Sequence, residues 1–261
     1  MARLDGKIAL VTGAGGGLGS AMSLAFASEG ASVVCQDLDE GAAKSTVDAI
    51  AAAGGPEAMA WACDVSDSGA IDSMFAAATA RYGLVNVLVN CAGVDHTPND
   101  GSGEGNTGTE IQVAVMSDEG WQRMLDIHLN GAFFCTRAMV KRLVAAGEGG
   151  SIICISSIAG TAGWGPVHYA TAKAGLLGFV RATARFSGSL GIRANAIAPG
   201  VIDAGMTKGV APELLEPLRM MTPLGRFGDA SDIANAAVYL ASDESAFVTG
   251  QCISPNGGLV I

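Results

Sequence analysis

A glycine cluster that directly follows an apolar run sets narrow limits on the architecture of this chain. Residues 12–19 read TGAGGGLG and come after Ile8–Val11, a run of strand length. Gly13, Gly17 and Gly19 permit a positive-φ turn, a close approach of the backbone to a pyrophosphate, and tight packing of a helix on a strand. A lone cluster could be a flexible turn, but here a helix pattern and a carboxylate, Asp37, follow. We therefore predict a dinucleotide site at this turn.

Apolar runs of strand length alternate with helix-length segments along the chain. The seven expected strands are Ile8–Val11, Ser32–Gln36, Ala58–Cys63, Val87–Asn90, Ser151–Ile155, Arg193–Ala198 and Cys252–Ser254. The expected helices are Leu18–Glu29, Gly41–Ala53, Ser68–Tyr82, Glu119–Ala145, Tyr169–Gly188 and Ala230–Leu240. Crossovers of that length imply parallel strands, and continuous apolar runs imply helices on both faces of the sheet. We predict an α/β fold, with one doubly wound Rossmann domain over residues 1–261 and a seven-stranded parallel sheet.

The composition indicates one large globular domain and excludes some partners. Of the 261 residues, 49% are hydrophobic and 15% are charged, which suffices for one core. The net charge of −10 repels phosphate backbones and anionic surfaces, so we expect neither nucleic acid nor a membrane as a partner. The chain starts without a signal-type segment and lacks an uncharged apolar run of about 18 residues, which predicts a cytoplasmic location.

Cysteine and histidine spacing predicts no metal centre. The six cysteines have no C-x-x-C spacing and lie mostly within apolar runs, so we expect buried, reduced thiols. No histidine has a partner at metal-ligand spacing. His168 is expected to line the cleft or face solvent, and His96 lies in a polar loop.

Two segments interrupt the alternation of strands and helices. The first is a variable loop over residues 94–116, whose portion Asp95–Gly108 is rich in Gly, Asn and Asp and predicts a mobile surface loop. The second covers about residues 203–228 and holds an apolar helical patch around Leu214–Met221. Both follow carboxyl ends of expected strands, where ligands bind in open α/β sheets. Both are candidates for a substrate lid, and a plain connecting loop is the alternative for the first.

Asp37, at the end of the second expected strand, predicts a preference for NAD. A carboxylate there can accept hydrogen bonds from both ribose hydroxyls of the adenosine, and it would repel a 2′-phosphate. No Lys or Arg lies in the glycine cluster or between Asp37 and Lys44. A solvated carboxylate at a strand end is the alternative.

Tyr169 and Lys173 are four residues apart in a helix-forming stretch, so both side chains lie on one face. A tyrosine, whose free pKa is about 10, needs about 4 kcal/mol of anion stabilisation to act as a base near pH 7. A positive charge about 4 Å away supplies on the order of 4 kcal/mol at an effective dielectric of 20. We predict that Tyr169 is a general acid/base whose pKa Lys173 lowers. A core tyrosine beside a surface lysine is the alternative.

Five motifs follow one another in a recognisable order. They are Thr12-Gly-x-x-x-Gly-x-Gly19, Asn90-Cys-Ala-Gly93, Ser156, Tyr169-x-x-x-Lys173 and Asn195-Ala-Ile-Ala-Pro-Gly200. Together they resemble the short-chain dehydrogenase/reductase family over nearly the whole chain. The resemblance implies an oxidoreductase that moves a hydride between nicotinamide and a secondary alcohol or ketone. It also implies a homotetramer with the two longest helices and the C-terminus at interfaces.

The resemblance also assigns roles to single residues. Ser156, thirteen residues before Tyr169, would bind the substrate oxygen, with Ser157 as the alternative, and Lys173 would also hold the nicotinamide ribose. The residues expected to bind the cofactor are Gly13, Gly17, Leu18, Gly19, Asp37, Leu38, Asp64, Val65, Asn90, Ala92, Tyr169, Lys173, Pro199, Gly200 and Ile202.

Two departures from the family pattern affect the proposed chemistry. His128 stands where the family usually has an asparagine that relays protons, and it could pass a proton through water or be merely structural. Asn130 lies two residues further on and would point elsewhere on the helix. Ala204 stands where a threonine commonly faces the carboxamide, and Thr207 is the candidate replacement.

Three functions remain open at this stage. Trp164, Met206, Met220 and Met221 suggest a hydrophobic alcohol or ketone, unless they are ordinary core residues. A 3-oxoacyl thioester (acyl-carrier-protein) reductase is the alternative enzyme, against which Asp37 weighs because such reductases usually take NADPH. A redox-sensing nucleotide-binding protein without catalysis is conceivable because of His128.

Overall fold

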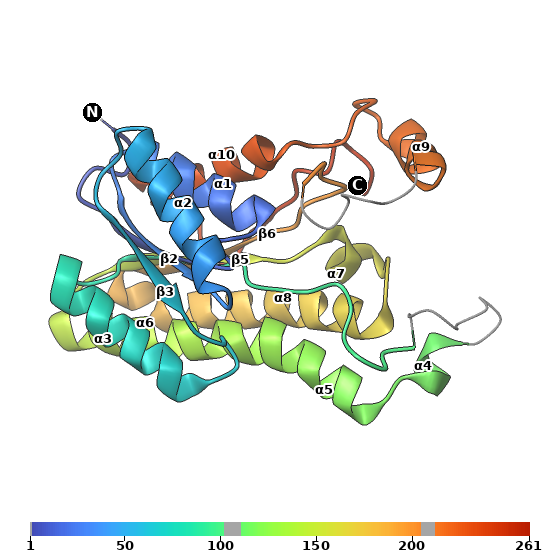
Figure 1. Cartoon of the computed structure of the whole chain (residues 1–261), viewed down its shortest axis with the longest axis horizontal. Helices are drawn as coiled ribbons and strands as arrows, with labels where there is room; N and C mark the ends of the chain where they lie inside the picture. The colour runs from blue at the N-terminus through green and yellow to red at the C-terminus, as the bar shows by residue number, and fades with distance from the viewer. Residues whose placement is uncertain (1, 102–110, 205–211) are drawn as a thin grey trace.

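Seven parallel strands form one sheet at the centre of the molecule (Figure 1). The computed structural model describes residues 2–101, 111–204 and 212–261. The strand order is β3-β2-β1-β4-β5-β6-β7. The bounds are β1 Ile8–Thr12, β2 Ser32–Asp37, β3 Ala58–Ala62, β4 Val87–Asn90, β5 Gly150–Ile155, β6 Ile192–Ile197 and β7 Cys252–Ile253. The predicted fold class is confirmed, and the strand order turns back between β1 and β4, where open α/β sheets bind ligands.

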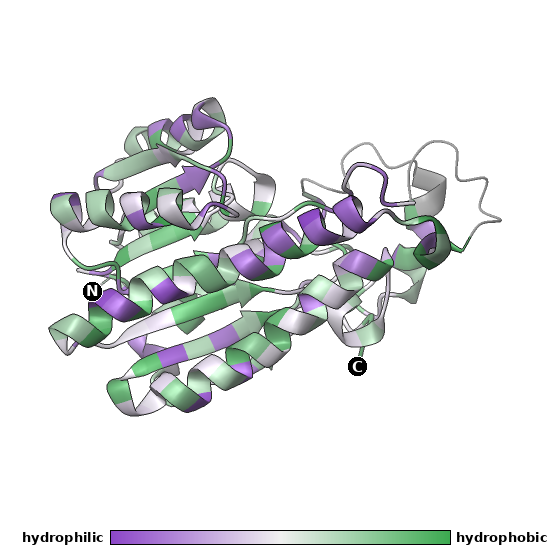
Figure 2. Cartoon of the chain, turned by 90° about the horizontal axis from the view of Figure 1, so that it is seen from below, coloured by the Kyte–Doolittle hydropathy of each residue, from purple (hydrophilic) through white to green (hydrophobic). Residues whose placement is uncertain are grey.

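Helices cover both faces of this sheet (Figure 1). One face carries α1 Gly17–Ser28, α2 Glu40–Ala52 and α10 Ala230–Ala241. The other carries α3 Ser68–Tyr82, α6 Gly131–Ala146 and α8 Val167–Ser187. Successive strand residues point to opposite faces, so β1 gives Val11 to one core and Leu10 to the other. Because both faces are covered, the strands are mostly apolar, as the green colour in Figure 2 shows, although β6 also carries Arg193 and Asn195.

The helix predicted over Glu119–Ala145 is interrupted in the structure. α5 covers Asp118–Leu125, a π-helical turn covers Asp126–Asn130, and α6 follows directly. The prediction of one continuous α-helix is therefore wrong. A single widened turn hardly alters the apolar periodicity, so the pattern does not reveal it. Such π-helical turns occur frequently at functional sites, and this one carries the buried His128.

The carboxyl ends of the central strands lie next to one another. The register pairs Thr12 with Gln36, Asn90 with Cys154, and Ile155 with Ile197. Three further helices lie beyond this edge of the sheet: α4 Gln112–Val115, α7 Ile158–Ala162 and α9 Pro212–Met221 (Figures 1 and 2). The segments predicted to surround a ligand therefore all gather at one end of the sheet.

The structure describes parts of the two irregular segments, residues 94–116 and about 203–228. Residues 102–110 and 205–211, with Met206 and Thr207, lie outside the described residues. The beginning of the first segment is a surface loop, as predicted, with His96, Pro98 and Asn99 exposed, but Thr97 and Asp100 within it are buried. In the second segment, Met220 and Met221 are 78% and 58% exposed, so these two methionines are not core residues.

The six cysteines are free thiols, and three of them are buried: Cys35, Cys135 and Cys154. The expectation of burial is wrong for Cys252, which is exposed because β7 is an edge strand. Among the described residues, no cluster of three or more imidazole, thiol or carboxylate side chains could hold a metal. No helix in the same part of the chain has the length and apolarity needed to cross a membrane.

Candidate active site

The glycine loop between β1 and α1 packs backbone against backbone. A Cβ added at Gly19 would lie 2.0 Å from the carbonyl oxygen of Gly13, and one at Gly15 would lie 2.4 Å from the Cβ of Ala42. Gly13 has a φ of +67°, which favours glycine. Side chains are thus excluded from this loop, so a phosphate group can approach its N–H groups.

The N-terminus of α1 has the properties of an anion site. Gly16 occupies the N-cap position without a side chain, and the first turn contains no acidic residue. The corresponding cap of α2 is the carboxylate of Asp39, which accepts hydrogen bonds from Gly41 and Ala42. Uncapped N–H groups and the positive end of the helix dipole attract a pyrophosphate. The residues of the loop therefore fit a dinucleotide.

Asp37 lies at the rim of the glycine loop. Its Oδ2 accepts a 2.9 Å hydrogen bond from the N–H of Gly15, and its Oδ1 accepts one of 3.1 Å from the N–H of Asp39. The next residue, Leu38, exposes 68% of its surface. A carboxylate and an exposed apolar side chain next to each other suit the ribose and the adenine of an adenosine.

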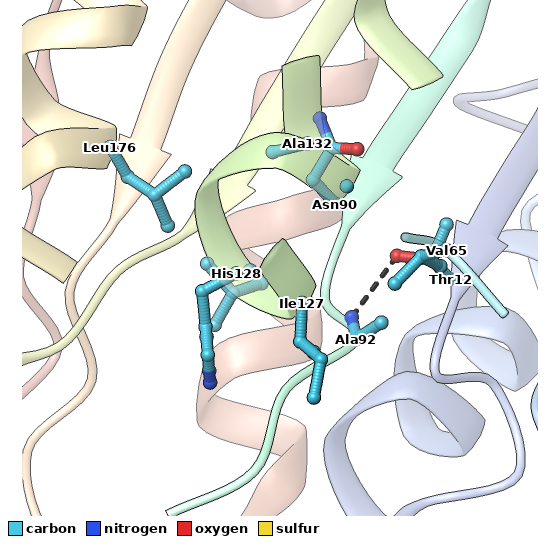
Figure 3. Close-up of a pocket in the computed structure, with 10 residues that line it drawn as sticks. Thr12, Val65, Asn90, Ala92, Ile127, His128, Ala132 and Leu176 are labelled. Atoms are coloured by element: carbon cyan, nitrogen blue, oxygen red, sulfur yellow. Dashed lines mark hydrogen bonds between the residues drawn. The ribbon is translucent and has the colours of Figure 1, made fainter. Parts of the chain in front are cut away.

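A small cavity continues from this loop into the sheet edge, with room for about one water molecule. Thr12 Oγ1 accepts hydrogen bonds of 3.0 Å from the N–H groups of Cys91 and Ala92 and so holds the end of β4 against β1 (Figure 3). Asn90 and Val65 also line the cavity. Asn90 Oδ1 is buried and has no hydrogen-bond partner among the described residues. The cavity therefore contains one polar atom that a bound molecule could satisfy.

Asp64 connects the adenine side of the cleft to α5. Its Oδ2 accepts a 2.8 Å hydrogen bond from Arg123, and its Oδ1 accepts one of 2.8 Å from the N–H of Ser66. Burial by itself would raise the pKa of Asp64, but the bonds from Ser66 and Arg123 lower it below its usual value. Asp64 is thus an anion that fixes the loop containing Val65.

Tyr169 and Lys173 lie together at the start of α8. The Nζ of Lys173 is 5.5 Å from the centroid of the Tyr169 ring, and it donates a 2.7 Å hydrogen bond to the carbonyl of Ile155. Burial lowers the pKa of Lys173 to about 8. The helical spacing thus brings the pair together as expected, with the ammonium directed at the end of β5.

The protonation of Tyr169 differs from the prediction. Burial raises the pKa of this phenol, a hydrogen bond with Ser157 opposes that rise, and the charge of Asp95 adds to it. The predicted lowering of the pKa by Lys173 is therefore wrong for the protein alone. The physical reason is that desolvation of the phenol outweighs the attraction of an ammonium that is bonded to Ile155.

The structure corrects the choice of serine. Ser156 is buried, and its hydroxyl donates a 2.8 Å hydrogen bond to the carbonyl of Lys173. Ser157 is the residue whose side chain hydrogen-bonds to that of Tyr169. It also caps α7 by accepting a 3.1 Å bond from the N–H of Ala159. The bond to Lys173 turns the Ser156 hydroxyl away from the phenol, so the geometry favours the alternative, Ser157, as the serine beside Tyr169.

His128 is buried beside Tyr169. The two rings are 5.5 Å apart and nearly perpendicular, and Nε2 of His128 lies 3.0 Å from the nitrogen and 2.8 Å from the oxygen of Val94. Nδ1 is buried without a partner in the described part of the chain. Burial lowers the pKa of His128, so the ring is neutral at pH 7. Asn130 bonds to Asp126 and does not reach the site.

The remaining predicted cofactor residues follow β6. The carbonyl of Pro199 accepts a bond from Ile158, and the N–H of Gly200 donates to the carbonyl of Pro255. Ile202 is 6% exposed and forms a bridge with Gly228. These contacts place the segment beside α7 and the C-terminus. Thr207, expected to replace the missing threonine at Ala204, falls in the undescribed stretch.

Sequence reasoning missed one pair of residues near the site. His168, expected in the cleft or in solvent, is fully buried, and its Nε2 lies 3.2 Å from Oδ2 of Asp100. The two residues are 68 positions apart. No local pattern could have indicated this contact.

Comparisons with known proteins agree with this geometry. A sequence profile for the family described as Enoyl-(Acyl carrier protein) reductase matches residues 13–260. The chain is 38% identical to (3R)-3-hydroxyacyl-CoA dehydrogenase of Canis lupus familiaris, over 98% of this chain and 97% of that protein. It is 35% identical to 3-oxoacyl-(acyl-carrier-protein) reductase of Escherichia coli K12, over 98% of each chain. The crystal structure of a protein assigned to the short-chain alcohol dehydrogenases, from Sinorhizobium meliloti 1021, matches with a TM-score of 0.88 and 34% identity, over 98% of this chain and 97% of that one.

Proposed function

Because this chain belongs to the short-chain dehydrogenase/reductase family, it is an oxidoreductase that acts on alcohols and ketones with a nicotinamide cofactor, and we propose that it prefers NAD(H) and a hydrophobic substrate. The observation that carries the proposal is the buried ammonium of Lys173, which lies 5.5 Å from the centroid of the Tyr169 ring, with the Ser157 hydroxyl lowering the pKa of the same phenol. Two hydroxyls and one cation at the carboxyl edge of the sheet can bind the oxygen of a substrate and exchange its proton.

The preference for NAD is supported by Asp37. Its carboxylate already accepts a hydrogen bond from Gly15, at the place where the adenosine ribose would bind. A 2′-phosphate would meet this negative charge. Gly13, Gly17, Leu18 and Gly19 would hold the pyrophosphate, and Leu38, Asp64 and Val65 would flank the adenine.

In the proposed mechanism, the side chains of the protein position the substrate and move the proton. When bound, the nicotinamide exchanges hydride at C4 and, in its oxidised form, brings a positive charge. Ser157 donates a hydrogen bond to the substrate oxygen and keeps it beside Tyr169. Tyr169 takes the hydroxyl proton during oxidation and returns it during reduction. Lys173 favours the phenolate by its charge and would hold the ribose.

We infer that His128 relays protons through a water in the cavity beside it. The Nε2–H of its neutral ring would donate to the carbonyl of Val94, which leaves Nδ1 as an acceptor. Asn90 Oδ1 lines the same cavity and also lacks a partner among the described residues. A water bound at Nδ1 would satisfy that atom and could carry the proton onward.

Reduction of a 3-oxoacyl thioester is the second candidate function. Two of the relatives are a (3R)-3-hydroxyacyl-CoA dehydrogenase and a 3-oxoacyl-(acyl-carrier-protein) reductase. A 3-hydroxyacyl thioester is itself a secondary alcohol, so the same three side chains would serve. The cofactor distinguishes the two proposals, since Asp37 disfavours NADPH.

We also propose a homotetramer with small-molecule substrates as the only further partners. Large apolar side chains are exposed on the helices expected at interfaces, Phe133 on α6 and Phe186 on α8, and at the C-terminal Ile261. Association would remove these apolar side chains from water.

A substrate panel tests the proposed activity. With NAD+ and hydrophobic secondary alcohols, nicotinamide absorbance should rise, and NADP+ should support turnover at least about tenfold more slowly. Asp37→Ser should narrow that difference in rate, whereas Asp39→Ser, two residues further along the chain, should leave it unchanged. Faster reduction of an acetoacetyl thioester with NADPH than with NADH would contradict the NAD assignment. Tight NADH binding with no turnover across the panel would instead indicate a nucleotide-binding protein without catalysis.

The two adjacent serines provide a matched pair of variants. Ser157→Ala removes the partner of Tyr169 and should lower kcat by about a hundredfold, as loss of one preorganised donor does. Ser156→Ala removes a bond to the carbonyl of Lys173 and should cost about 1 kcal/mol of unfolding free energy with a much smaller change in kcat. Thermal melts and steady-state rates measure both effects. The reverse order of kcat losses would restore Ser156 as the substrate-binding residue.

A further inference from the structure

A buried aspartate–histidine pair joins the segment after β4 to the first turn of α8. His168 is fully buried, and Asp100 is 2% exposed. The Nε2 of His168 lies 3.2 Å from Oδ2 of Asp100, and the same oxygen accepts a 2.8 Å hydrogen bond from the N–H of Thr97. His96 adds a third contact, with its Nδ1 3.6 Å from that oxygen. A buried carboxylate requires such partners, so the contacts of Asp100 and His168 are part of the packed structure.

The second ring nitrogen of His168 contacts the backbone of the catalytic tyrosine. Nδ1 accepts a 2.9 Å hydrogen bond from the N–H of Tyr169. Since Nδ1 accepts, the proton of the neutral ring resides on Nε2, which donates it to Asp100. Asp100 therefore selects the tautomer of His168 that can hold the Tyr169 amide.

These contacts replace an ordinary helix cap. The N-cap residue of α8 is Pro166, which makes no capping bond with a side chain. Gln112 of α4 accepts a 2.9 Å hydrogen bond from the N–H of Val167 and donates one of 3.3 Å to the carbonyl of Asp100. First-turn N–H groups need partners from outside the helix. Two of them find such partners here, one in Gln112 and the other in the ring that Asp100 orients.

The segment that contains Asp100 is itself anchored to α5. Thr97 Oγ1 donates a 2.8 Å bond to the carbonyl of Gly120, and the carbonyl of Asn99 accepts one of 3.0 Å from the N–H of Ser117. A Cβ at Gly120 would lie 2.9 Å from the carbonyl oxygen of Pro98. The segment thus fits closely against α5, and Asp100 transmits that fixed position to α8.

We propose that Asp100 is a positioning residue, which acts through His168 and the Tyr169 amide to hold the phenol in the orientation required for proton transfer. This inference rests on the proposed function, because it concerns the same site. Asp100 acts through other residues, since the contacts described above join its carboxylate to His168, Thr97 and His96. The proposal assigns the segment after β4 a role in catalysis that its polar composition did not indicate.

Kinetics of Asp100 variants test the proposal. Asp100→Ala should lower kcat by about ten- to hundredfold, the scale expected for a misplaced catalytic group. The Kd for NADH should stay within about twofold, because the cofactor loop is on other elements. Asp100→Asn keeps an acceptor for His168 and should retain most of the activity; if Asp100→Ala does not fold, the wild-type tautomer measurement described next carries the test. Asp72→Ala, at a surface carboxylate of α3, is the matched control. Unchanged kcat in folded Asp100→Ala, or equal losses in both variants, would overturn the proposal.

A second measurement does not depend on activity. Long-range proton–nitrogen spectra of the full chain should show His168 neutral at pH 7 with its proton on Nε2, and His168→Gln identifies the signal. Asp100→Ala should redistribute that proton between the nitrogens and speed hydrogen exchange of the Tyr169 amide. A proton on Nδ1 of His168 in the wild type refutes the positioning role. A wild type without turnover but with the expected tautomer refutes the proposed function alone.

Discussion

Tyr169→Phe is expected to reduce the oxidation of a secondary alcohol by about 10²–10⁴-fold, the range of general acid–base catalysis. The substitution removes only the hydroxyl that hydrogen-bonds to Ser157, and it keeps the ring that packs edge-on against His128 at 5.5 Å. Binding of NADH should therefore change little. Nicotinamide absorbance measures the loss of turnover, and a fluorescence titration measures the binding.

Tyr239→Phe is the matched control for this prediction. Tyr239 lies on α10, on the face of the sheet opposite α8, and packs against the core of that face. Removal of its hydroxyl should leave kcat unchanged. If Tyr169→Phe kept more than a few per cent of the wild-type turnover, the phenol would not be the proton carrier.

Lys173→Met should lower kcat/KM by about 10²-fold near pH 7, comparable to the loss of one preorganised charge. The Nζ of Lys173 lies 5.5 Å from the centroid of the Tyr169 ring, and a positive charge this close favours the phenolate over the phenol. The variant keeps the length of the side chain but loses this charge and the bond to the carbonyl of Ile155. Lys141→Met, at an exposed position of α6, serves as the control.

The pH profile of kcat/KM should identify the lysine. Burial lowers the pKa of Lys173 to about 8, so the ammonium is present below that pH and is lost as the pH rises through it. The wild-type contribution of Lys173 should decline above about pH 8 accordingly, because kcat/KM reports groups of the free enzyme. Lys173→Met should lack this descending limb. If Lys173→Met is slow but its kcat/KM still declines above about pH 8, another group titrates in that range.

As the pH rises above about 8, the free energy of unfolding should increase while kcat/KM decreases. An unfolded lysine keeps its proton up to the usual pKa of 10.5, whereas the buried one releases it near 8. The unfolding free energy of the wild type should therefore rise between these two pH values. At pH 7 the buried charge costs on the order of 3 kcal/mol, at about 1.4 kcal/mol per pKa unit, partly offset by the Ile155 bond. Lys173→Met should thus melt no lower than the wild type.

Elements that are formed by contiguous residues could be predicted from the sequence alone. The run at Ile8–Thr12, the glycine loop and α1 are contiguous, so their apolar period and missing Cβ atoms indicate a strand, a turn and a helix. The pair of Tyr169 and Lys173 could likewise be predicted from the sequence, because the two residues are one helical turn apart. Their proximity follows from helix geometry alone.

The choice between Ser156 and Ser157 needed the tertiary structure. The N–H of Ser156 bonds to the carbonyl of Ile197, so the extended pairing of β5 with β6 continues one residue beyond the strand. Successive residues of an extended chain point to opposite sides. Ser156 therefore turns towards the backbone of Lys173, and Ser157 turns towards Tyr169. The thirteen-residue spacing before Tyr169 does not show where the extended backbone ends, so it cannot show which serine side chain points to Tyr169.

The amino-acid sequence by itself determined the α/β class, the nucleotide turn with Asp37 beside it, and the tyrosine–lysine pair, because each depends on spacing within one or two elements. Only the tertiary structure decided which serine faces the phenol, where the ammonium of Lys173 points, and that Asp100 meets His168 across 68 residues. These features depend on how distant segments pack and on how much water they exclude. Burial changes the pKa of Tyr169, Lys173 and His128 from values that the residue types alone would suggest.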